Sequence, residues 1–338
     1  MRITGLNLVK HDLNLIGGTH GLSVDTLISH VNTLATDQGR VVGTPGHEDA
    51  KNYILSQLST TKLRPPTGNS FEIPYEMEGV VFTNIVGMLE GRNKELPSIL
   101  LGAHYDTIYD TPGADDNAAA VSILLEIARE LKPRRLEHSV IFCIFDAEEP
   151  PNFLQPSMGS IRYYLDQRKS DIHCALIMDL VGHDVPINSF EDLLFITGME
   201  SQQALSQSLL YTTPPKPLRP IPILNANIGD LSDHHVFRLN EVPYLFMSCG
   251  IWRHYHSPTD TPDRLNYEKI YRIKQYLEEL VNDIDKRDLT GKFEGYDSTP
   301  VEANFLNKNA GPLLPSGSVT TRPEIDAAVQ AIALSFGL

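Results

Sequence analysis

Histidine and carboxylate side chains follow the apolar runs of this sequence. His104 and Asp106 come directly after one such run. Glu148 and Glu149 follow the next apolar run along the chain, and Asp179 ends a third. In open α/β sheets, ligands bind at the carboxyl ends of the strands. We therefore expect these side chains to gather at one edge of a sheet and to form a site there.

Five side chains in this pattern have the chemistry of metal ligands. They come from separate parts of the chain and are His104, Asp116, Glu149, Asp179 and His256. Carboxylates gathered at one sheet edge repel one another, by about 4 kcal/mol for a pair about 4 Å apart at an effective dielectric near ~20. Arg253 is the one cation that accompanies these motifs. Bound cations must therefore supply the compensating charge.

Zinc is the metal that suits this set best. Imidazole and carboxylate ligation favours zinc, although cobalt or manganese fits the same geometry. Two divalent cations would offset the charge of Asp116, Glu149 and Asp179. A pair of closely spaced metals needs a shared ligand, which a carboxylate supplies by bridging. We predict two zinc ions per chain, with Asp116 as the bridging ligand.

Strand and helix patterns alternate along the chain. Apolar runs predict strands over 71–75, 80–89, 98–103, 140–145, 174–180, 193–197 and 242–247. Helical spacing predicts helices over 24–36, 47–58, 118–131, 159–167, 201–210, 232–239, 267–284 and 324–336. Alternation of this kind indicates an α/β protein with a mostly parallel sheet covered by helices.

Two segments depart from this alternation. Residues 213–225 are rich in proline, which favours an extended loop that could form a pocket wall. Residues 288–322 are rich in Gly, Pro, Ser and Asn, and we expect them to wrap the surface or to be mobile. We therefore predict a single domain over 1–286 and a C-terminal tail over 287–338.

The composition narrows the range of partners and compartments. The formal net charge is -15, and no cluster of Lys and Arg is apparent, so we expect neither nucleic acid nor an anionic membrane as partner. No stretch reaches the roughly 18 apolar residues of a membrane span. The stretch 1–12 lacks the apolar block of a secretory signal. This predicts a cytoplasmic protein, or a secreted or periplasmic one if a leader has been removed.

Five motifs in register give the sequence a resemblance to a known family. They are His104-Tyr-Asp106, Gly113-Ala-Asp-Asp-Asn117, Asp146-Ala-Glu-Glu149, Met178-Asp-Leu-Val-Gly182 and Tyr255-His-Ser257. In this order they resemble the cocatalytic dizinc peptidases, the family that includes bacterial leucyl aminopeptidases, glutamate carboxypeptidases and glutaminyl cyclases. The resemblance covers roughly 22–284. It implies a phosphorylase/hydrolase-like α/β/α fold of three layers with a mixed central sheet, and it makes 1–286 a zinc peptidase domain.

The resemblance also implies a role for each residue of the site. The implied ligands are His104 and Asp179 for one zinc, Glu149 and His256 for the other, and Asp116 for both. Glu148 would be the general base that takes a proton from the attacking water. Asp106 is placed to accept the second ring N–H of His104, and Asp260 would do the same for His256. Tyr255 would donate a hydrogen bond to the tetrahedral oxyanion.

The activity implied first is that of a metallo-aminopeptidase acting on the N-terminal residue of a peptide, because no insert is long enough for the extra domains of the glutamate carboxypeptidases. A glutaminyl cyclase, an acyltransferase with one zinc, remains open, although its pocket typically uses several Trp and this chain has 1. Arg253 keeps a carboxypeptidase or amidase open, since a guanidinium pairs with a substrate carboxylate. The fourth alternative is a metal-free binding protein of the transferrin receptor kind, against which the intact ligands and base argue.

Overall fold

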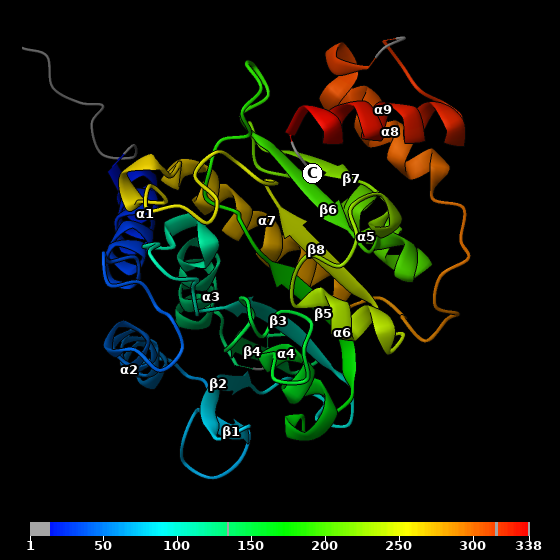
Figure 1. Ribbon diagram of the computed structural model, residues 1–338. Helices are drawn as coiled ribbons and strands as arrows, with labels where there is room; N and C mark the ends of the chain where they lie inside the picture. Colours follow the sequence, from blue (N-terminus) through cyan, green and yellow to red (C-terminus); the bar gives the residue numbers. More distant parts are fainter. Residues whose placement is uncertain (1–13, 134, 315–316, 337–338) are drawn as a thin grey trace, which may run out of the picture.

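The central sheet has eight strands in the described part of the chain (Figure 1). The computed structural model describes residues 14–133, 135–314 and 317–336. The strands are β1 (Glu72–Met77), β2 (Val80–Leu89), β3 (Ser98–His104), β4 (Val140–Phe145), β5 (Ile172–Met178), β6 (Leu193–Thr197), β7 (Arg219–Pro222) and β8 (Tyr244–Ser248). Their order across the sheet is β1-β2-β4-β3-β5-β8-β6-β7. The stretch 1–12, on which the prediction about a secretory leader depends, lies outside the described residues.

The middle of the sheet is parallel and its flanks introduce antiparallel pairs. β4, β3, β5 and β8 run in the same direction. β2 is antiparallel to β4 and to β1, and β6 is antiparallel to β8 but parallel to β7. The four central strands are buried along almost their whole length, as strands covered on both faces must be. The predicted mixed, mostly parallel sheet is therefore confirmed.

Helices cover both faces of this sheet (Figure 1). One apolar cluster includes α1 (Asn14–Leu34), α2 (Pro45–Ser59), α3 (Ala119–Glu130), α5 (Gln203–Tyr211) and α7 (Tyr267–Ile284). A second cluster, on the opposite face, includes the region of α4 (Gly159–Arg162) and α6 (His234–Leu239). Neighbouring side chains of β4, such as Phe142 and Cys143, belong to different clusters because side chains alternate along a strand. The arrangement is a three-layer α/β/α fold, and among the described helices none is long and apolar enough to cross a membrane.

The edge of the sheet at β7 differs from the sequence prediction. α8 (Thr299–Ala310) packs beside β7, and α9 (Arg322–Phe336) packs against α8 (Figure 1). The composition of 288–322 predicts a segment that wraps the surface or is mobile, and it does not predict that this segment contains a helix such as α8. Phe305 and Leu306 of α8 are buried, and this tertiary packing stabilises a helix that its composition does not predict. The proline-rich segment likewise contains β7, because an edge strand tolerates proline.

The strand ends meet at the place where a site is expected. β4, β3 and β5 are neighbours and parallel, so their carboxyl ends lie at the same edge of the sheet. His104 is the last residue of β3, Glu148 and Glu149 follow β4, and Asp179 follows β5. This topology brings together side chains that are far apart in the sequence.

Candidate metal centre

Imidazole and carboxylate groups from three segments meet beyond the end of β3. The Nε2 atom of His104 lies 3.3 Å from Oδ1 of Asp116 and 3.6 Å from Oδ1 of Asp179. All three side chains are buried. One ligand atom from each lies within 4.8 Å of the others, a spacing that suits a single metal ion. These three residues are the ligands that the sequence assigns to one zinc, with Asp116 shared.

A second group lies on the other side of Asp116. The Nε2 atom of His256 lies 3.2 Å from Oδ2 of Asp116 and 3.1 Å from Oε2 of Glu149. The two carboxylate oxygens of Asp116 therefore face different histidines, Oδ1 toward His104 and Oδ2 toward His256. A carboxylate in this position can bridge two metal ions. The structure thus brings all five predicted ligands together.

Several of these ligand atoms lack a hydrogen-bond partner within the described residues. The buried atoms in question are Nε2 of His104, Nε2 of His256, Oε1 of Glu149 and Oδ1 of Asp179. Buried polar atoms are normally satisfied, so unsatisfied atoms that converge on one point indicate a ligand site. Imidazole and carboxylate donors in two groups that share Asp116 fit zinc.

Burial and neighbouring charges move the ionisable groups of the centre away from their ordinary pKa values. Burial raises the pKa of Glu149 to about 8, and the charge of Asp116 adds to this effect. Burial alone would lower the pKa of His256, but the adjacent carboxylates of Asp116 and Glu149 raise it to about 10. For Asp116, burial acts to raise the pKa, and the two histidines more than offset it and lower the pKa. This concentration of negative charge favours a bound cation.

Glu148 lies beside both groups. Its Oε2 atom is 3.8 Å from Nε2 of His104, and the side chain borders an apolar cavity next to the ligands. Burial raises the pKa of Glu148 well above its ordinary value; the charge of His104 opposes this, and Glu149 adds to it. The Glu148 carboxylate therefore lies where the candidate ligands and the cavity meet.

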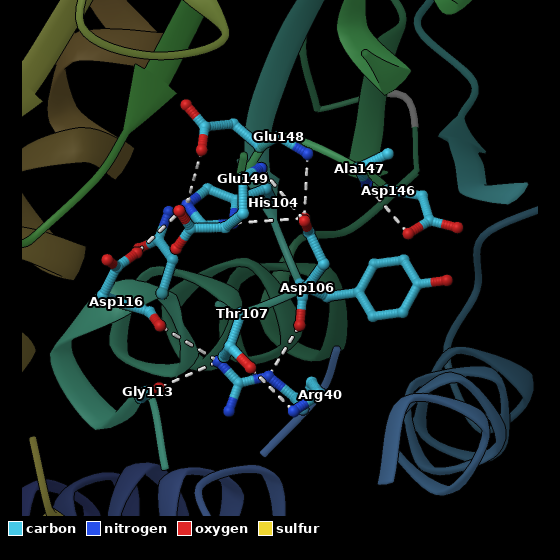
Figure 2. Close-up of polar contacts among 12 residues, drawn as sticks. Arg40, His104, Asp106, Thr107, Gly113, Asp116, Asp146, Ala147, Glu148 and Glu149 are labelled. Carbon is cyan, nitrogen blue, oxygen red and sulfur yellow. Dashed lines mark hydrogen bonds and ion pairs between the residues drawn. The ribbon is translucent and has the colours of Figure 1, made fainter. Parts of the chain in front are cut away.

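Asp106 connects His104 to the loop that carries the two glutamates (Figure 2). Its Oδ1 atom lies 3.4 Å from Nδ1 of His104. The same carboxylate accepts the backbone N–H groups of Glu148 and Glu149, each at 3.0 Å. Asp106 therefore holds the end of β3 and the loop after β4 in one arrangement. The sequence predicts the first contact but not the two backbone hydrogen bonds.

Asp260 contacts the turn that carries Asp116. Its carboxylate accepts the backbone N–H of Asp115 at 2.9 Å and that of Asp116 at 3.1 Å. The prediction that Asp260 fixes the ring of His256 is therefore wrong. A tight turn, in which the Asp260 N–H donates to the carbonyl of Ser257, positions this carboxylate at the Asp115–Asp116 backbone instead.

Asp115 links the ligand-bearing loops from behind. It accepts the N–H of Gly182 at 2.6 Å, and its other oxygen lies 2.7 Å from Nδ1 of His183. The ring of His183 stacks on Trp252 at a centroid distance of 4.7 Å. These contacts join the turn of Asp116, the loop after Asp179 and the segment before His256. Trp252 accordingly packs against His183 and is absent from the described lining of the cavity.

Three non-glycine residues near the ligands have left-handed backbone conformations. Ala147, which precedes Glu148, has φ 56°, Leu180, which follows Asp179, has φ 54°, and His256 itself has φ 51°. Such conformations cost free energy for residues with a Cβ and persist where the surrounding structure enforces them, which is often at functional sites.

An apolar cavity of about 160 Å³ adjoins the centre. Its apolar walls come from Pro150, Phe153, Leu180, Phe195, Ile228, Leu231, Phe246 and Ile251. Among the described residues that line it, none is a Lys or an Arg. Arg253 is exposed, and its Nε donates to His254. The prolines of 213–225 lie outside this lining; Pro214 and Pro217 of that segment instead line a separate cavity.

Tyr255 lines the same cavity and packs on a ligand. Its ring stacks on that of His256 at a centroid distance of 3.7 Å. Burial raises the pKa of Tyr255, and the charges of Asp116 and Glu149 add to the effect. The hydroxyl therefore stays protonated and can donate a hydrogen bond into the cavity.

The sequence analysis missed a buried cation behind the centre, Arg40. This side chain is 1% exposed and lies next to the turn of Asp116 (Figure 2). It comes from the segment between α1 and α2, more than sixty positions before the first ligand. Local motifs carry no signal for such a partner, because Arg40 bonds to backbone carbonyls of segments far away in the sequence.

Comparisons with known proteins identify the family of this chain. The pattern that defines Peptidase family M28 matches residues 84–281, and the chain belongs to this family. It is 27% identical over 213 residues to the uncharacterized protein YfbL of Escherichia coli, covering 52% of this chain and 64% of YfbL. It is 28% identical over 205 residues to human endoplasmic reticulum metallopeptidase 1, covering 55% of this chain and 21% of that protein. The chain thus spans less than two thirds of each relative.

Solved structures share the fold at low sequence identity. LapB from Legionella pneumophila matches with a TM-score of 0.63 and 18% identity, covering 83% of this chain and 77% of LapB. The glutaminyl cyclase of Tannerella forsythia matches with a TM-score of 0.58 and 18% identity, covering 78% of this chain and 99% of the cyclase. This chain therefore shares its α/β/α fold with LapB and with this glutaminyl cyclase.

Proposed function

We propose that this chain is a zinc-dependent aminopeptidase with two zinc ions per chain. The observation that carries the proposal is the position of Asp116, whose two oxygens face His104 and His256 from either side. A bridged pair of metals is expected of a hydrolase that activates water, whereas a cyclase of this scaffold needs one zinc. Membership of peptidase family M28 supports a peptide as substrate.

The cavity beside the centre supports an N-terminal residue with an apolar side chain as the group that is recognised. Aromatic and aliphatic walls favour burial of an apolar side chain, at roughly 25 cal/mol per Å² of buried surface. A C-terminal carboxylate would find no Lys or Arg among the described residues of this lining. Arg253, on which the carboxypeptidase or amidase alternative depends, is absent from the described lining of this cavity, and this favours the aminopeptidase.

In the proposed reaction, each residue of the site has a separate role. When bound, zinc supplies Lewis-acid activation of a water molecule and of the scissile carbonyl. Glu148, at the border of the cavity, accepts the proton of the attacking water and returns it to the leaving amine. Tyr255 donates a hydrogen bond to the oxyanion that forms at the carbonyl. Asp106 fixes the position of the His104 ring relative to the backbone of Glu148.

A panel of three substrates, each assayed with and without a chelator, tests the proposal. The panel consists of leucine nitroanilide, a peptide that begins with Gln, and an N-acyl amino acid. We expect hydrolysis of leucine nitroanilide that the chelator abolishes. Glutamate nitroanilide, assayed beside the panel as a matched control, should be a poor substrate. Cyclisation of the Gln peptide would favour the cyclase, and cleavage of the N-acyl amino acid alone would favour a carboxypeptidase or amidase.

A further inference from the structure

All five N–H groups of the Arg40 guanidinium donate hydrogen bonds to backbone carbonyls. Its Nε donates to the carbonyl of Tyr105 at 2.6 Å, and Nη1 donates to those of Leu34 and Pro112 at 3.0 and 2.7 Å. Nη2 donates to the carbonyls of Gly113 and Asp116 at 2.8 and 3.3 Å. A guanidinium has five N–H donors in a fixed planar fork, and each finds an acceptor here.

Four of these carbonyls, all except that of Leu34, belong to the segments that carry His104 and Asp116. Tyr105 directly follows His104, and Pro112 and Gly113 come shortly before Asp116 in the sequence. Figure 2 shows Gly113 and Asp116 beside the guanidinium of Arg40. The Arg40 backbone adds a second connection, because its N–H donates to Oγ1 of Thr107 at 2.8 Å and its carbonyl accepts the N–H of Thr107 at 3.3 Å. Arg40 therefore holds the end of β3 and the Asp116 turn at a fixed separation.

The turn fits closely around this side chain. Gly113 has φ 66°, and a Cβ at that position would lie 2.8 Å from Nη2 of Arg40 and 2.4 Å from Cγ2 of Thr107. The backbone has to approach the guanidinium this closely to bring the carbonyl of Gly113 within hydrogen-bonding distance. Glycine is therefore required where the turn meets Arg40.

The positive charge of Arg40 lies close to the carboxylates of the metal centre. Burial lowers its pKa to about 10, while the carboxylates of Asp116 and Asp260 act to raise it. The group thus stays positive at neutral pH, although burying a cation is costly unless charges or hydrogen bonds compensate. A side chain of similar shape without charge would be cheaper to bury if the only task were to join loops. The nearby carboxylates of the metal centre give a reason for the charge.

We propose that Arg40 is a positioning residue that sets the affinity of the centre for zinc by fixing the Asp116 carboxylate relative to His104. This inference rests on the proposed function, because it assumes that these residues bind zinc. Residues that orient metal ligands from behind commonly change metal affinity by about 10- to 100-fold when they are replaced.

The test is the zinc affinity of Arg40→Lys, measured on purified apoprotein by competition with a chelator of known affinity. Lysine keeps the charge but has three donors in place of the five-donor fork. We expect an affinity about 10- to 100-fold lower than that of the wild type. Arg322→Lys is the matched control, since Arg322 bonds to Glu302 and Ser298 at the α8–α9 contact. It should change thermal stability and leave zinc affinity unaltered.

Wild-type zinc affinity in a folded Arg40→Lys protein would overturn the inference. If that variant does not fold, Thr107→Val decides in the same way, because it removes the acceptor of the Arg40 N–H while keeping the shape of the side chain. An unchanged zinc affinity in Thr107→Val would then contradict the proposal. If the wild-type protein itself bound no zinc, both this inference and the proposed function would be overturned.

Discussion

Glu148 is suited to accept a proton because it is buried next to the ligands and still borders the cavity. We predict that Glu148→Gln lowers kcat by about 10²- to 10⁴-fold, since the amide keeps the shape of the side chain but cannot act as a base. Zinc content should stay at the wild-type value, measured by elemental analysis of the same sample. The exposed Glu95→Gln serves as control and should have normal activity. Near-normal turnover by Glu148→Gln would remove the base assignment.

His173 makes the stability of the fold sensitive to acid. Burial, together with the charge of His138, lowers the pKa of His173 to about 4, and the two rings stack at 4.0 Å. In the unfolded chain the pKa is about 6.5, so between these values the unfolded state binds more protons and stability falls as the pH falls. This residue should lower the free energy of unfolding by on the order of 1 to 2 kcal/mol between about pH 7 and about pH 5.

His173→Phe should remove that part of the pH dependence. Urea denaturation of the wild type and the variant at both pH values measures it, and the control is the comparison at about pH 7, where His173 is neutral in both states. The same loss of stability on acidification in both proteins would contradict the prediction.

The individual residues of the site differ in how far the sequence reveals them. His104, Glu149 and Asp179 each adjoin an apolar run, so the strand that delivers each of them can be recognised from the sequence. Asp260 accepts backbone N–H groups of the Asp116 turn, and Arg40 donates to a backbone carbonyl of this turn. Such backbone partners leave no mark in a motif. Their positions depend on how distant loops pack, which local patterns do not determine.

The strands and helices around the centre were predicted well where packing agrees with local pattern. Buried parallel strands appear as continuous apolar runs, which is why β3, β4 and β5 could be recognised. α8 could not, because its sequence is mostly polar and the helix depends on its contact with β7. The ligand loops are positioned by the order of these strands, since β4, β3 and β5 end side by side.

The contact between α8 and the rest of the fold can be tested with one substitution. Leu306 is 0% exposed and belongs to the main apolar cluster. We predict that Leu306→Ala lowers the free energy of unfolding by about 2 to 5 kcal/mol, because it leaves a cavity. Leu210→Ala, at a leucine that is 46% exposed, is the matched control and should have little effect. Equal stability of the two variants in urea denaturation would show that α8 contributes little.

The molecule as a whole combines an acidic surface with a centre that needs cations. The net charge of -15 and the buried carboxylates both favour cations over anions near the protein. We propose that the described part of the predicted C-terminal tail wraps the edge of the sheet and folds with the preceding domain as one unit, because α8 packs beside β7 and α9 packs against α8. Localisation stays a prediction, since it depends on a stretch outside the described residues.

The central claim is that Asp116 bridges two metal ions. Crystals of the zinc-loaded chain, measured at the zinc absorption edge, would locate each bound ion by anomalous scattering. We predict two peaks, each about 2.0 to 2.2 Å from one oxygen of Asp116, one beside His104 and Asp179 and the other beside Glu149 and His256. A single peak, or peaks that do not share Asp116, would contradict this account of the site.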